Sequence, residues 1–313
     1  AKQTRAPAEG EALVKALWLS IDPYMRGRMN DGKSYSAPVK LGGVMGGGSV
    51  GRVVESRAPG LAAGDLVEGY GGWQEYWTAP AKDLRKLDPD IAPASTALGI
   101  LGMPGFTAWY GLTQIGRPKR GETVVVSAAS GAVGGLVCQL AQQAGARVVA
   151  VAGEPRKLDW LAREIGVAAT VNHRAASLAE DLAAACPQGI DVYYENVGGA
   201  TLAAVIPLLN KDARVPVCGL IAQYNATALQ AGPNQLPLLM RAILTNRVLV
   251  QGFIISDHYD LFPRFLAEVA PLVTSGAITY REDVVQGLEA AVPAFQGLLE
   301  GRNFGKLLVR LAE

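Results

Sequence analysis

The most constraining feature of this chain is a strand, glycine turn, helix and strand pattern within residues 123–152. A valine-rich run at 123–127 predicts a strand that is buried on both faces. It leads into ASGAVG at 129–134 and then into a helical segment that ends at Gly145. A second valine-rich run follows at 147–152. This βαβ pattern is typical of domains that bind dinucleotides.

The turn has the chemistry that a pyrophosphate requires. Backbone N–H groups and the positive end of a helix bind phosphate, and a glycine lets the backbone approach it closely. Gly131 suits that approach, while Gly134 lets the helix pack against the strand. Ala129 replaces the first glycine of the usual G-x-G-x-x-G motif, so an ordinary βα turn is the alternative. We predict that the cofactor is bound by Gly131, Ala132, Val133 and Gly134.

The end of the second strand indicates which dinucleotide is bound. An NAD site usually places Asp or Glu about 20 residues beyond the glycines, where it holds the ribose hydroxyls. Gly153 occupies that position here, and the sequence Glu154-Pro155-Arg156-Lys157 follows. A small residue followed by two cations favours a 2′-phosphate and therefore NADPH. Two alternatives remain, because Glu154 suits a ribose and the two cations also suit a solvated helical turn.

Composition narrows the class of protein further. The chain has 313 residues, a net charge of +1 and 50% apolar residues, which predicts two domains and no nucleic-acid partner. No apolar run reaches the roughly 18 to 20 residues of a membrane span, and no signal-peptide pattern opens the chain. Cys138, Cys186 and Cys218 are scattered and form no C-x-x-C pair. We therefore expect buried thiols, no disulfides and a cytoplasmic protein.

The order of the expected elements predicts a nucleotide domain inserted into a β-rich domain. Residues 11–20 alternate as a strand does, and the glycine-dense segments up to about residue 98 favour a small barrel. The final segment contains an expected strand at 278–283, a helix at 287–300 and a strand at 306–311, and it is expected to return to the first domain. We place the domains at 1–98 plus 277–313 and at 99–276. The expected parallel strands of an α/β, doubly wound Rossmann sheet are 123–127, 147–152, 169–172, 192–195, 214–218 and 248–255.

Segments along nearly the whole chain carry a family resemblance. They are LSIDPYMRGRM, ILGMPGFTAW, VSAASGAVGGLVCQLA, GIDVYYENVGG, CGLIAQYN, VQGFIISDHYD and GLLEGRNFGKLLV. In these segments the chain resembles the zinc-independent medium-chain reductases that include 15-oxoprostaglandin 13-reductase, plant alkenal reductase and bacterial curcumin reductase. The resemblance implies a GroES-like substrate domain, an NADP-binding Rossmann domain and a homodimer. It also implies NADPH-dependent reduction of the carbon–carbon double bond of α,β-unsaturated ketones and aldehydes.

The resemblance also carries over residues that bind the cofactor. Lys157 corresponds to the lysine that meets the 2′-phosphate. Further contacts correspond to Asn196, Cys218, Gly219, Phe253, Ile254, Ile255 and Asn303. The family usually has Asn-Tyr-Lys where this chain has Asn172-His173-Arg174, so His173 either replaces the tyrosine at the phosphate or is a surface residue. Residues 1–137 contain neither Cys nor His, the ligands of the zinc in related alcohol dehydrogenases, so we expect no metal.

The expected reaction needs a group that stabilises an enolate. Hydride transfer to the β-carbon leaves negative charge on the carbonyl oxygen. Tyr224 is our candidate, because a phenol donates a hydrogen bond at neutral pH without carrying charge. The alternative is a tyrosine that only shapes the pocket. Tyr24 and Tyr35 match substrate positions, with a structural turn as the alternative for Tyr24. A quinone reductase and a non-catalytic NADPH-binding protein remain the rival functions.

Overall fold

The computed structural model describes residues 5–226 and 234–312. The chain forms two compact units, one from residues within 1–103 and 281–313 and the other from Pro104–Tyr280. The first, which the family resemblance predicts to bind substrate, is called the substrate unit below, and the second, which it predicts to bind the cofactor, is called the nucleotide unit. No helix in the described part of the chain is both long and apolar enough to cross a membrane.

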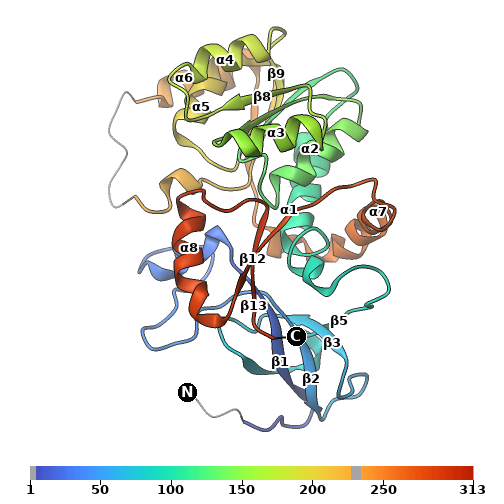
Figure 1. Ribbon diagram of the computed structural model, residues 1–313. Coiled ribbons are helices and arrows are strands. Elements are labelled where there is room, and N and C mark those ends of the chain that lie inside the picture. The colour runs from blue at the N-terminus through green and yellow to red at the C-terminus, as the bar shows by residue number, and fades with distance from the viewer. Residues whose placement is uncertain (1–4, 227–233, 313) are drawn as a thin grey trace. The chain divides into compact units, whose positions relative to one another are not determined.

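The nucleotide unit is built on a six-stranded sheet (Figure 1). Neighbouring strands pair in parallel in the order β11-β10-β9-β6-β7-β8. The order reverses between β6 and β9, which is the switch point at which doubly wound sheets bind ligands. The predicted Rossmann sheet is therefore confirmed. Its strands are β6 (Thr123–Val126), β7 (Arg147–Ala152), β8 (Ala169–Asn172), β9 (Ile190–Tyr194), β10 (Leu209–Val217) and β11 (Leu249–Gly252).

Helices connect these strands and cover the sheet. Gly145 ends the helix before β7 with a φ of 79°, a conformation that costs a glycine little. Val125, Val149 and Tyr193 from three adjacent strands pack in one cluster with apolar residues of α4, α5 and α6, so these three helices share a face. The helical segments are α1 (Met103–Tyr110), the π-helix η4 (Gly111–Gly116), α2 (Gly134–Gln143), α3 (Pro155–Arg163), α4 (Leu178–Ala185), α5 (Gly199–Val205), α6 (Leu236–Asn246) and α7 (Phe262–Thr274).

The substrate unit contains a seven-stranded sheet that joins both ends of the chain. Its strand β1 alternates between buried and less buried residues, as its sequence predicts, and pairs antiparallel with β2, β4 and β13. Strand β13 lies near the C-terminus, so the end of the chain pairs with its first strand. The strands are β1 (Glu11–Ser20), β2 (Ser49–Ser56), β3 (Leu66–Gly69), β4 (Tyr76–Pro80), β5 (Arg85–Lys86), β12 (Glu282–Gln286) and β13 (Lys306–Arg310). Helix α8 (Ala291–Leu299) and the 3₁₀ helices η1 (Pro23–Met29), η2 (Ala81–Asp83), η3 (Ala94–Leu98) and η8 (Leu288–Ala290) complete the unit.

Several predicted element boundaries are wrong. The strand expected at 278–283 is β12, which begins only at Glu282, because Ile278 is buried and its N–H instead donates to the Leu272 carbonyl at the end of α7. The strand expected at 248–255 stops at Gly252, and the 3₁₀ helix η7 (Ile255–Leu261) starts three residues later. The domain changes that we placed at 98/99 and 276/277 each precede a boundary between the two compact units.

Strand β10 begins well before the range that its sequence indicates. The pattern predicts a strand from residue 214, whereas β10 starts at Leu209. Its early part carries polar residues and includes Asp212 with a φ of 59°, and its pairing register with β9 shifts between Leu209 and Arg214. Because this irregular stretch breaks the apolar run, periodicity alone does not reveal it.

Candidate cofactor and active site

The glycine turn lies between β6 and α2. Ala128 adopts a left-handed φ of 48°, and its carbonyl oxygen accepts a hydrogen bond from the Gly131 N–H at 3.0 Å. A Cβ on Gly134 would lie 2.5 Å from the same oxygen and 2.7 Å from the Cα of Ala129. Both are backbone atoms, so a side chain at Gly134 requires the turn to move. This close approach brings the positive end of α2 to the carboxyl end of β6, which fits the pyrophosphate of a dinucleotide.

The remaining predicted turn residues, Ala132 and Val133, directly precede α2. Both are half-buried, as is Gly131. Residues 131–133 are therefore accessible to a ligand, while Gly134, the first residue of α2, is buried.

A group of cations lies at the carboxyl ends of β7 and β8. Ala152 pairs with Asn172 across these strands, which places Gly153 beside His173. A Cβ on Gly153 would lie 2.5 Å from the His173 Nε2 and 2.9 Å from the Arg174 Nε. The imidazole and the guanidinium thus cover the backbone of Gly153. The charge of Lys157, on the first turn of α3, helps to lower the pKa of the same histidine. Arg174 completes a cluster that the sequence analysis recognised only in part.

Lys157 is a buried cation. Its residue is only 6% exposed, and its Nζ lies 3.4 Å from the Glu154 Oε1. Burial lowers the pKa of Lys157, with smaller contributions from Arg156 and Arg174, and Glu154 opposes this fall. The Arg156 Nε lies 2.9 Å from the other Glu154 oxygen. Glu154, for which the sequence analysis kept a ribose contact as an alternative, is thus paired with two cations.

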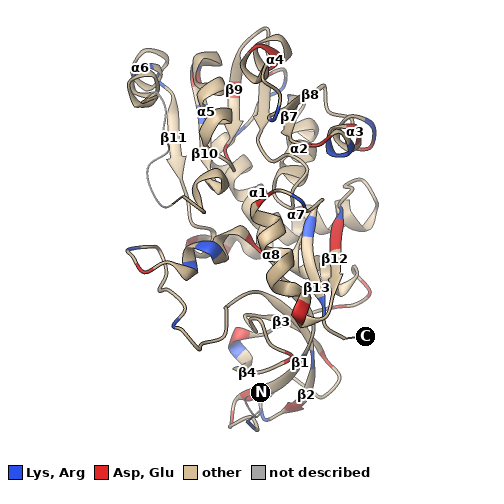
Figure 2. Cartoon of the chain, turned by 60° about the vertical axis from the view of Figure 1, so that its left-hand side comes forward, with Lys and Arg blue, Asp and Glu red and all other residues tan. Residues whose placement is uncertain are grey.

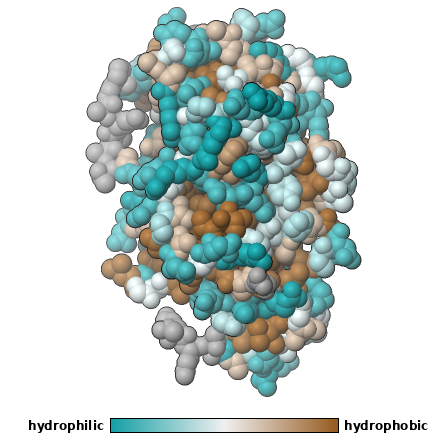
Figure 3. All heavy atoms as spheres, in the orientation of Figure 1, coloured by the Kyte–Doolittle hydropathy of each residue, from teal (hydrophilic) through white to brown (hydrophobic). Residues whose placement is uncertain are grey.

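Charged side chains are prominent on this part of the surface. In Figure 2, α3 carries both basic and acidic residues close to the end of β7. Figure 3 shows hydrophilic residues gathered over α3 on the face in view. A cation cluster at the end of the second βαβ strand is the arrangement that suits the 2′-phosphate of NADP.

Glu195 is a buried carboxylate at the end of β9 that the sequence analysis did not assign a role. It is 1% exposed. Its Oε1 accepts hydrogen bonds from the Tyr193 hydroxyl at 2.9 Å and from the Val197 and Gly198 N–H groups at 2.7 and 2.9 Å. The Ser127 hydroxyl lies 3.2 Å from the same oxygen. One carboxylate oxygen therefore holds the loop after β9 against the end of β6.

Asn196 links the same two strands. Its side-chain amide donates to the Ser127 carbonyl at 2.8 Å, and its backbone N–H donates to the Ser127 hydroxyl at 2.9 Å. The predicted cofactor residue thus has its amide oriented by β6. Only the three-dimensional pairing of β6 with β9 could reveal Ser127 as its partner.

The loop after β10 contains the proposed catalytic tyrosine. The Tyr224 hydroxyl accepts a hydrogen bond from the Leu220 N–H at 3.3 Å, and a Cβ on Gly219 would lie 3.1 Å from that hydroxyl. Cys218 precedes this loop, and burial raises the pKa of its thiol to about 12, with Tyr194 as a hydrogen-bond neighbour that lowers it. Cys218 is thus an unreactive packing residue beside a turn that orients Tyr224.

Phe253, Ile254 and Ile255 follow β11 at the same edge of the sheet and are half-buried. The Phe253 ring packs against Tyr110 with ring centroids 5.3 Å apart, and the His258 ring stacks on the same tyrosine with centroids 4.0 Å apart. Tyr110, which the sequence analysis did not select, therefore positions the segment after β11.

The remaining predicted residues belong to the substrate unit. The Arg28 guanidinium lies 5.6 Å from the ring centre of Tyr24 and 5.0 Å from that of Tyr35, which brings the two predicted tyrosines together. Burial, followed by the charge of Asp22 and the neighbouring Tyr70, raises the pKa of Tyr24 far above its usual value. Tyr24 therefore stays a neutral hydrogen-bonding phenol. Asn303 lies in a turn where its amide donates to the Gly305 carbonyl at 2.9 Å.

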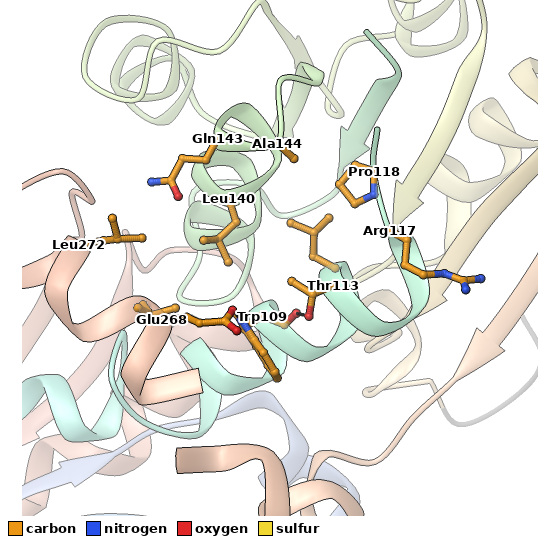
Figure 4. A pocket seen from close by; sticks show the side chains of 11 residues that line it. Trp109, Thr113, Arg117, Pro118, Leu140, Gln143, Ala144, Glu268 and Leu272 are labelled. Atoms are coloured by element: carbon orange, nitrogen blue, oxygen red, sulfur yellow. Dashed lines mark hydrogen bonds between the residues drawn. The ribbon is translucent and has the colours of Figure 1, made fainter. Parts of the chain in front are cut away.

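The nucleotide unit also contains a pocket of about 380 Å³ away from the glycine turn (Figure 4). It is lined by the C-terminal half of α2, by α7 and by the segment from Trp109 to Pro118. The Trp109 indole donates to the Glu268 carboxylate at 2.7 Å, and Arg264 pairs with the same carboxylate at 2.8 Å. Because the pocket contacts α2 at Leu140 and Gln143 and not at its first turn, it is separate from the cofactor site.

The two units together define the class of protein. A model described as the N-terminal domain of oxidoreductase matches residues 1–87, and one described as zinc-binding dehydrogenase matches residues 132–271. The fold is that of a medium-chain dehydrogenase/reductase. Within residues 5–226 and 234–312, no group of three or more His, Cys, Asp or Glu side chains is arranged to hold a metal ion.

Known relatives place the chain more closely. It is 52% identical over 307 residues to NADPH-dependent curcumin reductase of Escherichia coli, covering 98% of this chain and 89% of that one. It is 42% identical over 308 residues to 2-alkenal reductase (NADP(+)-dependent) of Nicotiana tabacum, covering 96% and 88%. CurA from Vibrio vulnificus, solved in complex with NADPH, matches with a TM-score of 0.94 and 46% identity over 100% of this chain and 94% of that one. The chain belongs to the zinc-independent medium-chain reductase family that contains these enzymes.

A more distant structure shares only the fold. Quinone oxidoreductase from Escherichia coli, solved with NADPH, matches with a TM-score of 0.79 at 22% identity. The resemblance to the double-bond reductases is thus much closer than the resemblance to this quinone reductase.

Proposed function

We propose that this chain is an NADPH-dependent reductase that acts on the carbon–carbon double bond of α,β-unsaturated ketones and aldehydes, including curcumin-like enones and alkenals. The observation that carries the proposal is the group of basic side chains Lys157, His173 and Arg174 around Gly153, in a chain whose relatives are NADP-dependent double-bond reductases. The low identity to the quinone reductase makes that function the weaker candidate.

The cofactor residues divide by the part of NADPH that each would hold. The turn from Gly131 to Gly134 suits the pyrophosphate, and Lys157 with His173 suits the 2′-phosphate. The carboxyl ends of β9, β10 and β11 suit the nicotinamide end, because they follow the switch point of the sheet. The proposed contacts there are Asn196, Cys218, Gly219, Phe253, Ile254 and Ile255.

Tyr224 acts on the carbonyl oxygen of the substrate in this proposal. When bound, NADPH supplies the hydride that the β-carbon receives. The Tyr224 phenol donates a hydrogen bond to the oxygen on which negative charge develops. In the structure the Leu220 N–H donates to the same phenol oxygen, which orients the ring and polarises its O–H group. In a separate step the α-carbon takes a proton from solvent water, and the enolate becomes the saturated carbonyl product.

The substrate unit contributes binding residues. Tyr24 and Tyr35 present aromatic rings that are held together by Arg28, and such rings suit the flat, conjugated skeleton of an enone. We assign Asn303 to the cofactor, as the family resemblance implies. Its side-chain amide is held in one direction by the hydrogen bond that it donates to the Gly305 carbonyl.

We also propose that two copies of the chain form a homodimer through β11. Among the described strands β11 is an edge strand, and Leu249 and Val250 are exposed on it. Helix α6 adds exposed Leu236, Leu238, Met240 and Leu244 beside this edge, and Figure 2 shows β11 without charged residues. Such an apolar, uncharged edge is suited to pair with a second copy. Light scattering should report a dimer in the wild type and a monomer in Val250→Lys, and a monomeric wild type would contradict this proposal.

The free thiols support a reducing compartment, and we assign the chain to the cytoplasm. Cys138 and Cys186 are buried, and Cys218 is half-buried. Burial raises the pKa of Cys138 to about 12 and that of Cys186 to about 11. Such thiols are neutral packing residues that need no oxidised partner.

The proposed reaction is tested by NADPH oxidation with a panel of enones, enals and quinones. Enones should be turned over, with the saturated ketone identified as product by mass spectrometry. Tyr224→Phe should lower kcat while NADPH affinity stays close to the wild-type value, because the hydroxyl acts on the substrate oxygen. Turnover of quinones alone, unaffected by this substitution, would refute the proposal and favour a quinone reductase.

A further inference from the structure

His173 occupies a position from which it can contact the 2′-phosphate directly. The parallel pairing of β7 with β8 places it next to Gly153, at the end of the strand where ribose and 2′-phosphate are distinguished. Because Gly153 has no side chain, the His173 ring lies directly over its backbone, and a Cβ there would lie 2.5 Å from the His173 Nε2. His173 is exposed, so a ligand can reach its ring.

The charges around His173 come from two segments. Arg174 follows it on the same loop, and Lys157 acts on it from the first turn of α3. Arg156 and Glu154 lie next to Lys157, and Glu154 forms ion pairs with both Arg156 and Lys157. The cations therefore outnumber the one carboxylate, and the positive field opposes a proton on His173 while no anion is bound.

We propose that His173 binds the 2′-phosphate as an imidazolium and takes up a proton when NADPH binds, so that the preference for NADPH over NADH depends on pH. This inference rests on the proposed use of NADPH. It concerns a specificity-determining residue, because NADH lacks the phosphate that the imidazolium would meet.

The direction of the pH dependence follows from the two states of the histidine. Desolvation of the ring by the surrounding protein atoms, with Arg174 and Lys157 adding to it, lowers the pKa of His173 in the free protein below its usual value. A phosphate beside the ring favours the charged form and raises the pKa in the complex. Between these two pKa values the free histidine is neutral and the bound one is charged, so binding consumes one proton. In this window NADPH affinity rises as pH falls, and outside it the proton uptake disappears.

The phosphate itself titrates and must be separated from the histidine. Its second pKa is about 6, so acid also removes charge from the ligand and weakens its binding. His173→Tyr gives the matched control, because tyrosine is the residue usual at this place in the family and supplies a hydrogen-bond donor that does not titrate near neutral pH. The difference between the wild type and His173→Tyr therefore isolates the proton on His173.

The test is calorimetric titration of the protein with NADPH and with NADH, without substrate, in buffers of different ionisation enthalpy. The titrations run from roughly pH 5.5 to 8.5, the range in which a histidine gains or loses its proton. The wild type should take up a proton fraction approaching one on binding NADPH within the window and none on binding NADH. The ratio of the NADH Kd to the NADPH Kd should fall by up to about tenfold for each unit of rising pH there, relative to His173→Tyr.

Two outcomes are decisive and distinct. Equal proton uptake by the wild type and His173→Tyr, with NADPH still preferred over NADH by both, would overturn the role of His173 and leave the proposed function intact. No preference for NADPH in the wild type at any pH would instead contradict the proposed cofactor itself. Thermal unfolding of His173→Tyr checks that the variant is folded in either case.

Discussion

Replacement of Glu195 by glutamine should loosen the cofactor side of the sheet without changing its shape. The carboxylate is 1% exposed, and its Oε1 accepts four hydrogen bonds, from the Ser127 and Tyr193 hydroxyls and from the Val197 and Gly198 N–H groups. Its Oε2 has no hydrogen-bond partner within the described chain. Glutamine has the same size but carries two N–H donors in place of one oxygen.

Either orientation of the glutamine amide is unfavourable. With its NH₂ group at the Oε1 position, four donors lose their acceptor and face another donor. With its NH₂ group at the Oε2 position, a buried donor has no acceptor, which costs about 1–3 kcal/mol. The four retained bonds also weaken, because a neutral acceptor binds N–H and O–H donors less strongly than a carboxylate does. Relief from burying a charge offsets part of this cost, so we expect a loss of roughly 2 kcal/mol in local stability.

Hydrogen exchange of the Val197 and Gly198 amides measures this loss where it occurs. A change of about 2 kcal/mol corresponds to roughly 30-fold faster exchange of these amides. NADPH should also bind more weakly to Glu195→Gln, because Asn196 lies on the loosened loop. Glu122→Gln is the matched control. Glu122 pairs with Arg214 at 2.6 Å just before β6, at the amino ends of the strands and away from the loops that carry Glu195. Unchanged exchange and NADPH affinity in Glu195→Gln would refute the reasoning.

Three further substitutions test separate parts of the structure. Lys157→Met should raise the Kd of NADPH by about 10- to 100-fold and leave that of NADH nearly unchanged, because one charge-assisted bond to the phosphate is lost; calorimetric titration measures both. Gly111→Ala should cost about 1–3 kcal/mol in thermal unfolding, because its Cβ would lie 2.5 Å from the Tyr194 hydroxyl. Lys306→Met should cost about 3–5 kcal/mol in denaturant unfolding, because Asp22, 2.7 Å from the Lys306 Nζ, would be buried without its cation.

Each of these substitutions has a control in the same chain. Lys119→Met removes an exposed cation before β6 and should leave the NADPH Kd unchanged. Gly32→Ala adds a Cβ where no atom lies within 4 Å, so it should not destabilise the protein. Arg302→Met breaks an exposed ion pair with Glu300, which contributes at most about 1 kcal/mol. Equal effects of a substitution and its control would contradict the corresponding explanation.

The sequence predicts the elements whose boundaries are marked by glycine or by a change in polarity. Strands β7 and β8 match their predicted ranges, because β7 lies between Gly145 and Gly153 and β8 is a short run after Gly166. Strand β10 is predicted only in its second half, since Asp212 interrupts its pattern with a left-handed conformation. Local patterns thus locate regular strands and miss irregular ones.

The candidate site is predictable from sequence where a residue has chemistry of its own. Lys157 and Tyr224 stand out by charge and by their motifs, and both lie in the nucleotide unit, Lys157 after β7 and Tyr224 after β10. Glu195 does not stand out, because its role depends on donors from β6, β9 and the following loop. Arg28 is similar, since its two aromatic partners are brought to it by the fold of the substrate unit.

The segment from α1 to η4 shows how packing distant from the cofactor determines the site. The Tyr194 hydroxyl donates to the Thr107 carbonyl at 2.7 Å, and Gly111 leaves room for both that hydroxyl and the Phe253 ring. A larger residue at Gly111 would displace the end of β9 and the segment after β11 together. Because both carry proposed nicotinamide contacts, this glycine couples their positions without touching the cofactor. The π-helix η4 therefore positions two parts of the proposed site. Gly111 is required there because it lets Tyr194 and Phe253 approach the helix backbone closely, and not because it makes the helix flexible.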